Sequence, residues 1–482
     1  MVKIKNYING EFQNALSGQT LESINPATGE VFATLPDSDV NDLNQAVEAA
    51  QKAQPSWGKQ SAEFRAGFLA KMSLLILENL DALAEAETTD NGKPLWLSQS
   101  VDIPRAAANF KFFADCISQF SSESHAMPGN AINYTLRQPL GVVGCISPWN
   151  LPLYLFTWKI APALAAGNCV IAKPSEVTPY SSFLLSEICQ QAGLPDGVLN
   201  IIHGSGKNIG QSLVEHPNVK AISFTGGTVT GQQIAALAAP MFKKLSLEMG
   251  GKNATLVFAD CDFERTVSEV TRAAFANQGQ ICLCGSRILV EESIYTPFKN
   301  ALLEKVKQLN VGDPLQQNSK QGAIVSEPHL NKIEQAVLLA KKDGGIILCG
   351  GHKIHLKERC QNGYFFEPTL IENLDENSTT NQAEIFGPVA TLIPFKDEQD
   401  ALAKANATDY GLAFSIWSQN ISRCHRLAES LEAGIIWVNC WMLRDLRTPF
   451  GGVKNSGVGR EGGFEALKFF TEPKNVCVQY GE

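Results

Sequence analysis

The feature that most constrains the fold is a series of short apolar runs separated by segments of helical periodicity. In the first half of the chain such runs occupy residues 141–147, 169–173, 198–202 and 221–224. This alternation is typical of buried parallel strands joined by crossover helices, because helices cover both faces of such a sheet. The first half is therefore predicted to form a doubly wound α/β domain, preceded by a surface helix at 40–57 that Ser38 caps.

The second half restarts the same alternation. Residues 254–258, 287–290 and 345–348 are predicted strands, and a helix is predicted near 263–275. A chain of 482 residues also exceeds the roughly 250–300 residues that one core supports. A second α/β domain follows. Residues 131–137 and 475–480 instead alternate with a period of two and are predicted to be edge or partner-facing strands.

Charge and composition exclude several classes of function. The net charge of −9 comes without a basic block, so nucleic acid is not an expected partner. The longest apolar stretch, 151–166, is interrupted by Lys159, and no signal peptide is evident, so we expect no membrane segment and a cytoplasmic location. The twelve scattered cysteines are predicted to be reduced thiols. No metal site is expected, because Cys282 and Cys284 form a single close pair, and His352 and His355 fit a solvated loop.

Four polar segments follow predicted strands or helices and are candidates for chemistry. Cys282 lies in a Gly-containing turn that can expose a thiol, although by itself a buried, inert cysteine would explain it better. Glu248 precedes two glycines and is either a general base or a strand-end carboxylate paired with a lysine. Asn150 stands between two prolines and can donate to an oxyanion. Gly226 and Gly227 open a helix suited to phosphate, whereas the dinucleotide-like loop at 204–210 misses the usual spacing by one residue.

The order and the residue patterns of these segments, from Tyr7 to the final strand, resemble those of the aldehyde dehydrogenase superfamily. Further matching motifs lie at 173–176, 384–388 and 449–457. The resemblance implies a Rossmann-like NAD-binding domain (1–120 and 141–250), an α/β catalytic domain (251–448) and a small β oligomerisation arm (121–140 and 464–482) in a homodimer or homotetramer.

The same resemblance implies the reaction. Cys282 attacks the aldehyde, Asn150 and the Cys282 N–H stabilise the oxyanion, and hydride transfer to NAD leaves a thioester. Glu248 then activates water; relatives that transfer the acyl group to coenzyme A generally lack this glutamate, so a free acid is expected. Glu461 matches a second carboxylate that helps to relay protons, although a helix-start carboxylate needs no such role.

For the cofactor, Lys173 and Glu176 match residues beside the adenosine ribose, where Glu176 favours NAD over NADP. Trp149, Gly226 and Gly227 match the diphosphate site, and Glu384 and Phe386 match the nicotinamide side. Two residues depart from the family pattern: Gly227 replaces a common serine, and Val229 replaces a common glutamate.

Two arginines resemble one branch of the family, the 2-aminomuconate and 2-hydroxymuconate semialdehyde dehydrogenases. Arg105 and Arg444 are predicted to bind the carboxylate of such a 6-semialdehyde. The alternative is a pair of structural contacts with Asp102 and Asp445, and Arg447 is also explained by a structural role. Other residues line an apolar entrance or belong to the core: Tyr154, Leu155, Phe156 and Trp158.

Two other functions remain open at this point. The first is oxidation of an uncharged aliphatic, aromatic or amino aldehyde by the same machinery. The second is a catalytically silent scaffold of the same fold, which retention of Cys282, Glu248, Asn150 and Glu384 disfavours.

Overall fold

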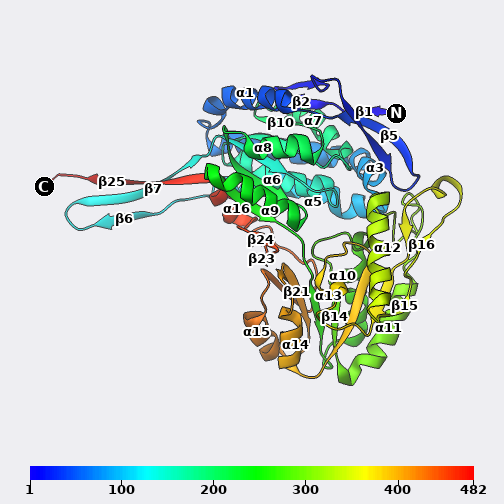
Figure 1. Cartoon of the computed structure of the whole chain (residues 1–482). Coiled ribbons are helices and arrows are strands. Elements are labelled where there is room, and N and C mark those ends of the chain that lie inside the picture. Colours follow the sequence, from blue (N-terminus) through cyan, green and yellow to red (C-terminus); the bar gives the residue numbers. More distant parts are fainter. Residues whose placement is uncertain (482) are drawn as a thin grey trace.

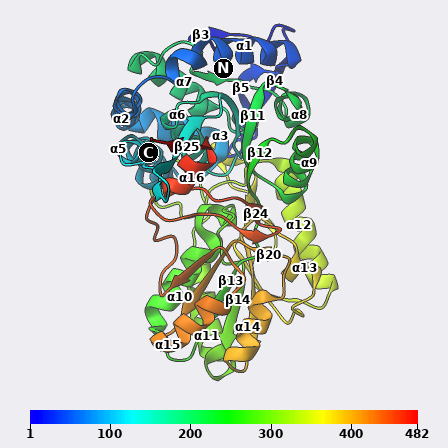
Figure 2. The same cartoon turned by 90° about the vertical axis from the view of Figure 1, so that its left-hand side faces the viewer.

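A computed structural model describes residues 1–481 and shows two α/β domains, one above the other, with an arm projecting from the first (Figures 1 and 2). The predicted α/β class is confirmed. The first domain is built on an eight-stranded sheet with a parallel centre. Its strands, in spatial order, are β24 (Gly457–Val458), β12 (Lys244–Glu248), β11 (Val219–Thr225), β8 (Val142–Ile146), β9 (Cys169–Lys173), β10 (Leu199–Ile201), β2 (Asn6–Ile8) and β3 (Glu11–Gln13).

Helices cover this sheet, and apolar side chains of the sheet and the helices are buried between them in one core. The first helix spans the predicted residues, but Asp39 caps it instead of Ser38, because the Asp39 carboxylate accepts from the Asn41 N–H. The helices are α1 (Val40–Trp57), α2 (Ala62–Glu78), α3 (Leu80–Asn91), α4 (Leu95–Leu97), α5 (Ile103–Ile117), α6 (Pro152–Ala165), α7 (Tyr180–Ala192), α8 (Gln211–Glu215), α9 (Thr228–Ala238) and α16 (Gly463–Phe469).

The second domain has a seven-stranded sheet, parallel except at one edge. In spatial order its strands are β15 (Ile346–Cys349), β18 (Thr369–Glu372), β19 (Val389–Phe395), β14 (Arg287–Glu291), β13 (Ala254–Val257), β21 (Ala413–Trp417) and β22 (Ile435–Val438). Its helices are α10 (Phe263–Phe275), α11 (Tyr295–Lys307), α12 (Glu327–Lys342), α13 (Thr379–Gln382), α14 (Glu398–Asn406) and α15 (Ile421–Ser430). The helix predicted near 263–275 is confirmed.

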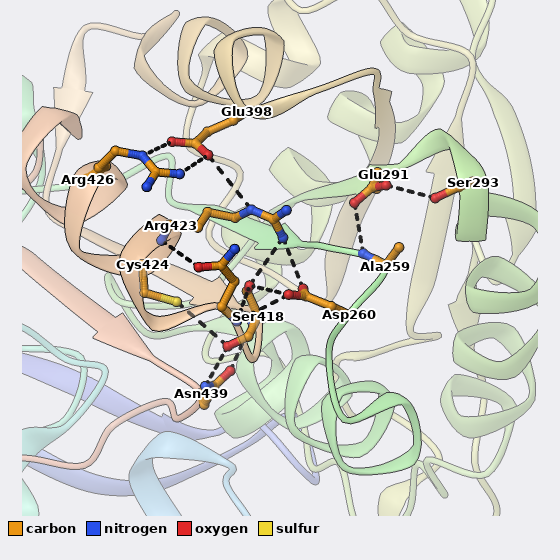
Figure 3. Close-up of polar contacts among 11 residues, drawn as sticks. Ala259, Asp260, Glu291, Ser293, Glu398, Ser418, Arg423, Cys424, Arg426 and Asn439 are labelled. Carbon is orange, nitrogen blue, oxygen red and sulfur yellow. Dashed lines mark hydrogen bonds and ion pairs between the residues drawn. The ribbon is translucent and has the colours of Figure 1, made fainter.

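A polar network at the far end of this domain ties α15 to the ends of β13 and β21 (Figure 3). The Arg423 guanidinium contacts Asp260 at 3.0 Å and Glu398 at 3.8 Å, and Arg426 pairs with Glu398 at 2.8 Å. Asp260 also accepts from the Ser418 hydroxyl. Since these groups bond one another, the network fixes the positions of helices and strands.

The projecting arm is a three-stranded antiparallel sheet of β6 (Ser124–Met127), β7 (Ala131–Pro139) and β25 (Thr471–Gln479). The two segments with a period of two thus pair with each other. The arm's second part begins at Thr471 instead of residue 464, because α16 buries Ala466 and Leu467 in the core of the first domain. Small sheets complete the fold: β1 (Val2–Lys3), β5 (Glu30–Pro36) and β4 (Thr20–Asn25); β16 (Lys353–Ile354) and β17 (Phe365–Phe366); β20 (Tyr410–Gly411) and β23 (Val453–Lys454).

The cysteines, the histidines and the apolar helices are the subject of separate predictions. All twelve cysteines are free thiols. Among residues 1–481, no group of metal-ligating side chains is found, and no helix has the length and apolar character needed to cross a membrane. His352 and His355 are exposed, and His352 pairs with Glu367.

Candidate active site

The carboxyl ends of the parallel strands β8, β9 and β11 meet at one edge of the first sheet. Loops from all three line a cavity of about 820 Å³, which is within the usual range for a ligand site. Trp149 follows β8, Lys173 ends β9, and Gly226 and Gly227 follow β11; all four line the cavity together with Glu176. The structure therefore brings together every residue assigned from the sequence to the adenosine and diphosphate part of NAD.

Glu176 lies at one side of this cavity. Its carboxylate accepts from the Lys173 ammonium at 2.9 Å and from the Gly206 N–H at 3.1 Å. Burial opposes ionisation, but these contacts outweigh it and hold the pKa of Glu176 below its usual value. The loop at 204–210, a weak match by spacing, thus closes the same site through Gly206, Lys207 and Gly210.

The diphosphate side of the cavity is the start of α9. No side chain caps this helix at Gly227, so its first N–H groups are free to bind phosphate oxygens. A Cβ at Gly226 would lie 2.4 Å from the Phe224 ring, whereas one at Gly227 would meet nothing within 4 Å. Gly226 is therefore required by packing. The departure from serine at Gly227 removes a hydroxyl without any steric cause. The uncapped start of α9 suits the diphosphate of a dinucleotide, and the nearby carboxylate of Glu176 suits its ribose hydroxyls.

A second cavity, of about 220 Å³, adjoins the first through shared residues that include Trp149 and Gly226. Cys282, Asn150 and Glu384 line it. Burial and the carboxylates of Glu384 and Glu248 raise the pKa of Cys282 above its usual value. The thiol is thus mostly protonated at rest and becomes a better nucleophile as the pH rises.

Asn150 reaches the nucleophile's loop directly. It is buried in the turn between β8 and α6, and its Nδ2 donates to the Gln280 carbonyl at 2.9 Å. This places a side-chain donor beside Cys282. Among residues 1–481, the Cys282 N–H donates to no protein acceptor, so it is free for an oxyanion.

Glu248 ends β12 and is buried, but neither of its carboxylate oxygens has a hydrogen-bond partner within residues 1–481. The alternative of a strand-end carboxylate paired with lysine is therefore wrong. Burial and the neighbouring Glu461 raise the pKa of Glu248 well above its usual value. A carboxyl group in this state can act as a general base near or above neutral pH.

Glu461 pairs with Lys159 at 2.7 Å and accepts from the Ser223 hydroxyl at 3.2 Å. All three residues are buried. Lys159, which interrupts the longest apolar stretch of the sequence, thus compensates the charge of Glu461 inside the first domain. Both charges lie near enough to Glu248 to influence its pKa.

Glu384 and Phe386 line the same cavity as Asn150. Glu384 accepts from the Gly251 N–H at 2.8 Å, and burial raises its pKa to about 7. Gly250 cannot be larger, since a Cβ there would lie 2.3 Å from the Glu384 carboxylate. Gly250 therefore lets the Glu384 loop approach, and Gly251 admits the nucleophile's loop, since a Cβ there would lie 2.8 Å from the Cys282 carbonyl oxygen. The Phe386 ring lies edge-on to Trp149 at 5.2 Å between ring centres.

The two arginines of interest lie beside a third cavity, of about 860 Å³. Arg444 donates to the Tyr154 hydroxyl at 3.1 Å and lies 3.9 Å from the centre of the Phe450 ring. Arg105 lies over the rings of Tyr154 and Trp158, at 5.2 and 5.6 Å. Burial and the charge of Arg444 lower the pKa of Arg105, with Tyr154 acting in the opposite direction. Two like charges thus lie close together.

Neither arginine has a carboxylate partner within residues 1–481. Asp102 pairs with Lys93 at 2.6 Å, and Asp445 pairs with Arg447 at 2.6 Å. The alternative pairs with Asp102 and Asp445 are therefore wrong, and Arg447 has the structural contact. All four apolar candidates, Tyr154, Leu155, Phe156 and Trp158, are buried in the cores, and none lines the three cavities. Tyr154 and Trp158 also contact the arginines.

Comparison with known proteins identifies the family. The family model described as "Aldehyde dehydrogenase family" matches residues 12–476. The chain belongs to the aldehyde dehydrogenase family. It is therefore an oxidoreductase that acts on aldehydes, and the superfamily resemblance noted in the sequence is confirmed.

Named relatives and solved structures agree with this assignment. The chain is 44% identical to the 2-aminomuconic semialdehyde dehydrogenase of Danio rerio, over 99% of this chain and 98% of that protein. It is also 44% identical to the 2-hydroxymuconic semialdehyde dehydrogenase of Pseudomonas sp. (strain CF600), over 99% and 100% of the two chains. A point mutant of the betaine aldehyde dehydrogenase from Staphylococcus aureus, in complex with NAD+, has a TM-score of 0.96 at 36% identity, over 99% and 98% of the two chains.

Several residues of this aldehyde dehydrogenase's site were not found from the sequence. His329 and Lys332 line the cavity of Cys282, and His329 Nε2 lies 2.7 Å from the Phe386 carbonyl. Both belong to α12, where their helical spacing is the only signal. Asn91 and Asn277 contact the backbone of Asn150. Asn277 begins the amide-rich segment before Cys282, and that composition is the one signal that marks it.

Proposed function

We propose that this aldehyde dehydrogenase uses NAD to oxidise a semialdehyde that carries a carboxylate, namely 2-aminomuconate or 2-hydroxymuconate 6-semialdehyde. The observation that carries the proposal is the pair of close arginines, Arg105 and Arg444, without an acidic partner. Both arginines are partly exposed, and their hydrogen-bond partners, Asn109 and Tyr154, are neutral. A substrate carboxylate that reaches them would therefore gain charge-assisted hydrogen bonds. The names of the relatives at 44% identity point to the same substrate class.

The residues of the site account for the reaction. The Cys282 thiolate adds to the aldehyde carbon, and the oxyanion accepts hydrogen bonds from the Asn150 amide and the Cys282 N–H. NAD, when bound, supplies the ring carbon that takes up the hydride. Glu384 and Phe386 would hold its nicotinamide side, and Glu176 would bind the ribose hydroxyls and repel a 2′-phosphate.

Oxidation leaves an acyl group on the Cys282 sulfur as a thioester. Glu248 removes a proton from water, which attacks the acyl carbon and releases the carboxylic acid with the thiolate. Lys159 and Glu461 offer a buried route by which that proton leaves Glu248.

Replacing Arg444 with glutamine tests the substrate. We expect KM for the carboxylate-bearing semialdehyde to rise by about 30-fold or more, because truncating one partner of a desolvated charge pair costs about 2–5 kcal/mol. The KM for an uncharged aldehyde of similar length should change by less than about threefold. Steady-state NADH formation measures both.

Arg447→Gln is the matched control, since Arg447 lines the same cavity but already pairs with Asp445. It should leave both substrates unaffected. An equal loss with charged and uncharged aldehydes in the Arg444 variant, or no loss at all, would contradict carboxylate recognition. The same panel under NAD and NADP tests the preference assigned to Glu176.

We also propose that the enzyme is a homodimer or a dimer of dimers joined through the arm of β6, β7 and β25. The arm projects from the body, and most residues of β6 and β25 are exposed in the single chain. Unpaired strand edges of this kind tend to bind another chain. Light scattering should give two or four times the chain mass; a single-chain mass would refute the assembly.

A further inference from the structure

Three consecutive residues before the nucleophile have left-handed backbone. Asn277, Gln278 and Gly279 have φ of 51°, 57° and 67°. Asparagine tolerates this region and glycine is free in it, but glutamine is not favoured there. A turn of this shape persists only where its surroundings hold it.

Buried amides hold the turn at several points. The Gln278 side chain donates to the Ala323 carbonyl at 3.1 Å, and the Val325 N–H donates to the Gln280 side chain at 3.1 Å. Gly279 lies so near the Glu384 loop that a Cβ would be 2.1 Å from the Gly387 carbonyl oxygen. The turn therefore joins the nucleophile's loop to the wall of the cofactor cavity.

Asn277 joins this turn, which belongs to the second domain, to the first domain. Its buried Nδ2 donates to the Asn150 carbonyl at 3.0 Å and lies 3.4 Å from the Gln280 carbonyl. The Asn150 amide donates to that same Gln280 carbonyl at 2.9 Å. Two amides and two carbonyls thus form a closed ring of contacts.

The ring fixes the residue that donates to the oxyanion. Asn150 is held at its backbone by Asn277 and more weakly by Asn91, whose Nδ2 lies 3.5 Å from the Asn150 carbonyl and 2.9 Å from that of Trp149. Without Asn277, the closest side-chain donor to the Asn150 carbonyl is lost. Small displacements of a catalytic donor reduce rates strongly.

We propose that Asn277 is the positioning residue of the oxyanion site, acting through Asn150. This inference rests on the proposed role of Asn150 in the reaction. Asn277 contacts neither the thiol nor the substrate cavity directly. Its effect should therefore appear in the step that forms the oxyanion and disappear when the Asn150 amide is absent.

Asn277→Gly is the decisive variant, because glycine keeps the left-handed backbone and removes only the amide. We expect kcat to fall by about 10- to 100-fold while KM for NAD stays within about threefold. Alkylation of Cys282 by iodoacetamide should keep its native rate, since displacement at that carbon forms no oxyanion. Asn373→Gly is the control: Asn373 also has a positive φ and donates to a backbone carbonyl, at Gly344, far from the site.

A double-mutant cycle with Asn150→Ala distinguishes positioning from general damage. In the Asn150→Ala background, Asn277→Gly should change kcat by less than about threefold. Equal losses in both backgrounds, a native kcat in the single variant, or a parallel loss of alkylation would each overturn the proposal.

Two provisions keep the test independent of folding and of substrate. If the glycine variant does not fold, Asn277→Ala replaces it in the same cycle, because alanine has no donor and its strain at positive φ is modest. The cycle is also run with an uncharged aldehyde. Failure of the carboxylate-substrate proposal then leaves the Asn277 result unaffected.

Discussion

Replacing Cys282 with alanine is expected to lower NADH formation by about 10⁴-fold or more. Among residues 1–481, no other thiol lines the cavity that holds Asn150 and Glu384, so no other side chain there can form the thioester in its place. Loss of a catalytic nucleophile commonly costs this much or more. Steady-state kinetics measures the loss, and titration with NAD shows that the cofactor still binds.

Cys284→Ala is the matched control, because Cys284 is buried two residues away and its Sγ faces the Ala276 carbonyl at 3.8 Å. The Cys284→Ala variant should form NADH at a rate within a few-fold of the native rate. Native activity in the Cys282 variant would contradict the nucleophile assignment.

The thiol's environment also predicts a pH dependence. Because burial and nearby carboxylates raise the pKa of Cys282, its thiolate fraction at neutral pH is below one half. That fraction increases about tenfold per pH unit until the pKa is reached. Alkylation of the free enzyme by iodoacetamide should therefore accelerate from pH 6 to 9, and a rate already constant at pH 6 would contradict the raised pKa.

The second large effect is expected for Glu248→Gln. Turnover should fall by about 10²–10⁴-fold, because glutamine cannot take a proton from the hydrolytic water. Since Glu248 acts after the oxidation, each site should still produce one NADH in a rapid burst. The acyl group should then remain on Cys282, where intact-protein mass spectrometry detects it.

Glu264→Gln is its control, because Glu264 is an exposed carboxylate on α10 in the second domain. The raised pKa of Glu248 gives the sign of the pH effect: native turnover should rise with pH as this carboxyl ionises, and the variant should lose that part of the rise. Loss of the burst together with turnover would show that Glu248 acts before hydrolysis.

Local sequence determined the elements and much of the chemistry. Apolar runs set the strands, because a strand covered on both faces needs continuous apolar residues, and helical periodicity predicted α1 with its observed bounds. Asn150 follows a strand of the first sheet, whereas Cys282 and Glu384 precede strands of the second sheet. Strand topology alone therefore did not unite them, and it was the resemblance to the aldehyde dehydrogenase superfamily that assigned all three to one site before any distance was known.

Pairing of charges and closure of loops were decided only by tertiary structure. Asp102 lies close to Arg105 in sequence, so an ion pair between them was the alternative. In the fold, Asp102 instead pairs with Lys93, and among residues 1–481 neither Arg105 nor Arg444 contacts a carboxylate. The Asn277 contact with Asn150 likewise joins residues 127 positions apart in different domains. Sequence spacing specifies neighbours along one strand or helix, whereas the Asp102 pair depends on how segments of the first domain pack and the Asn277 contact on how the two domains pack.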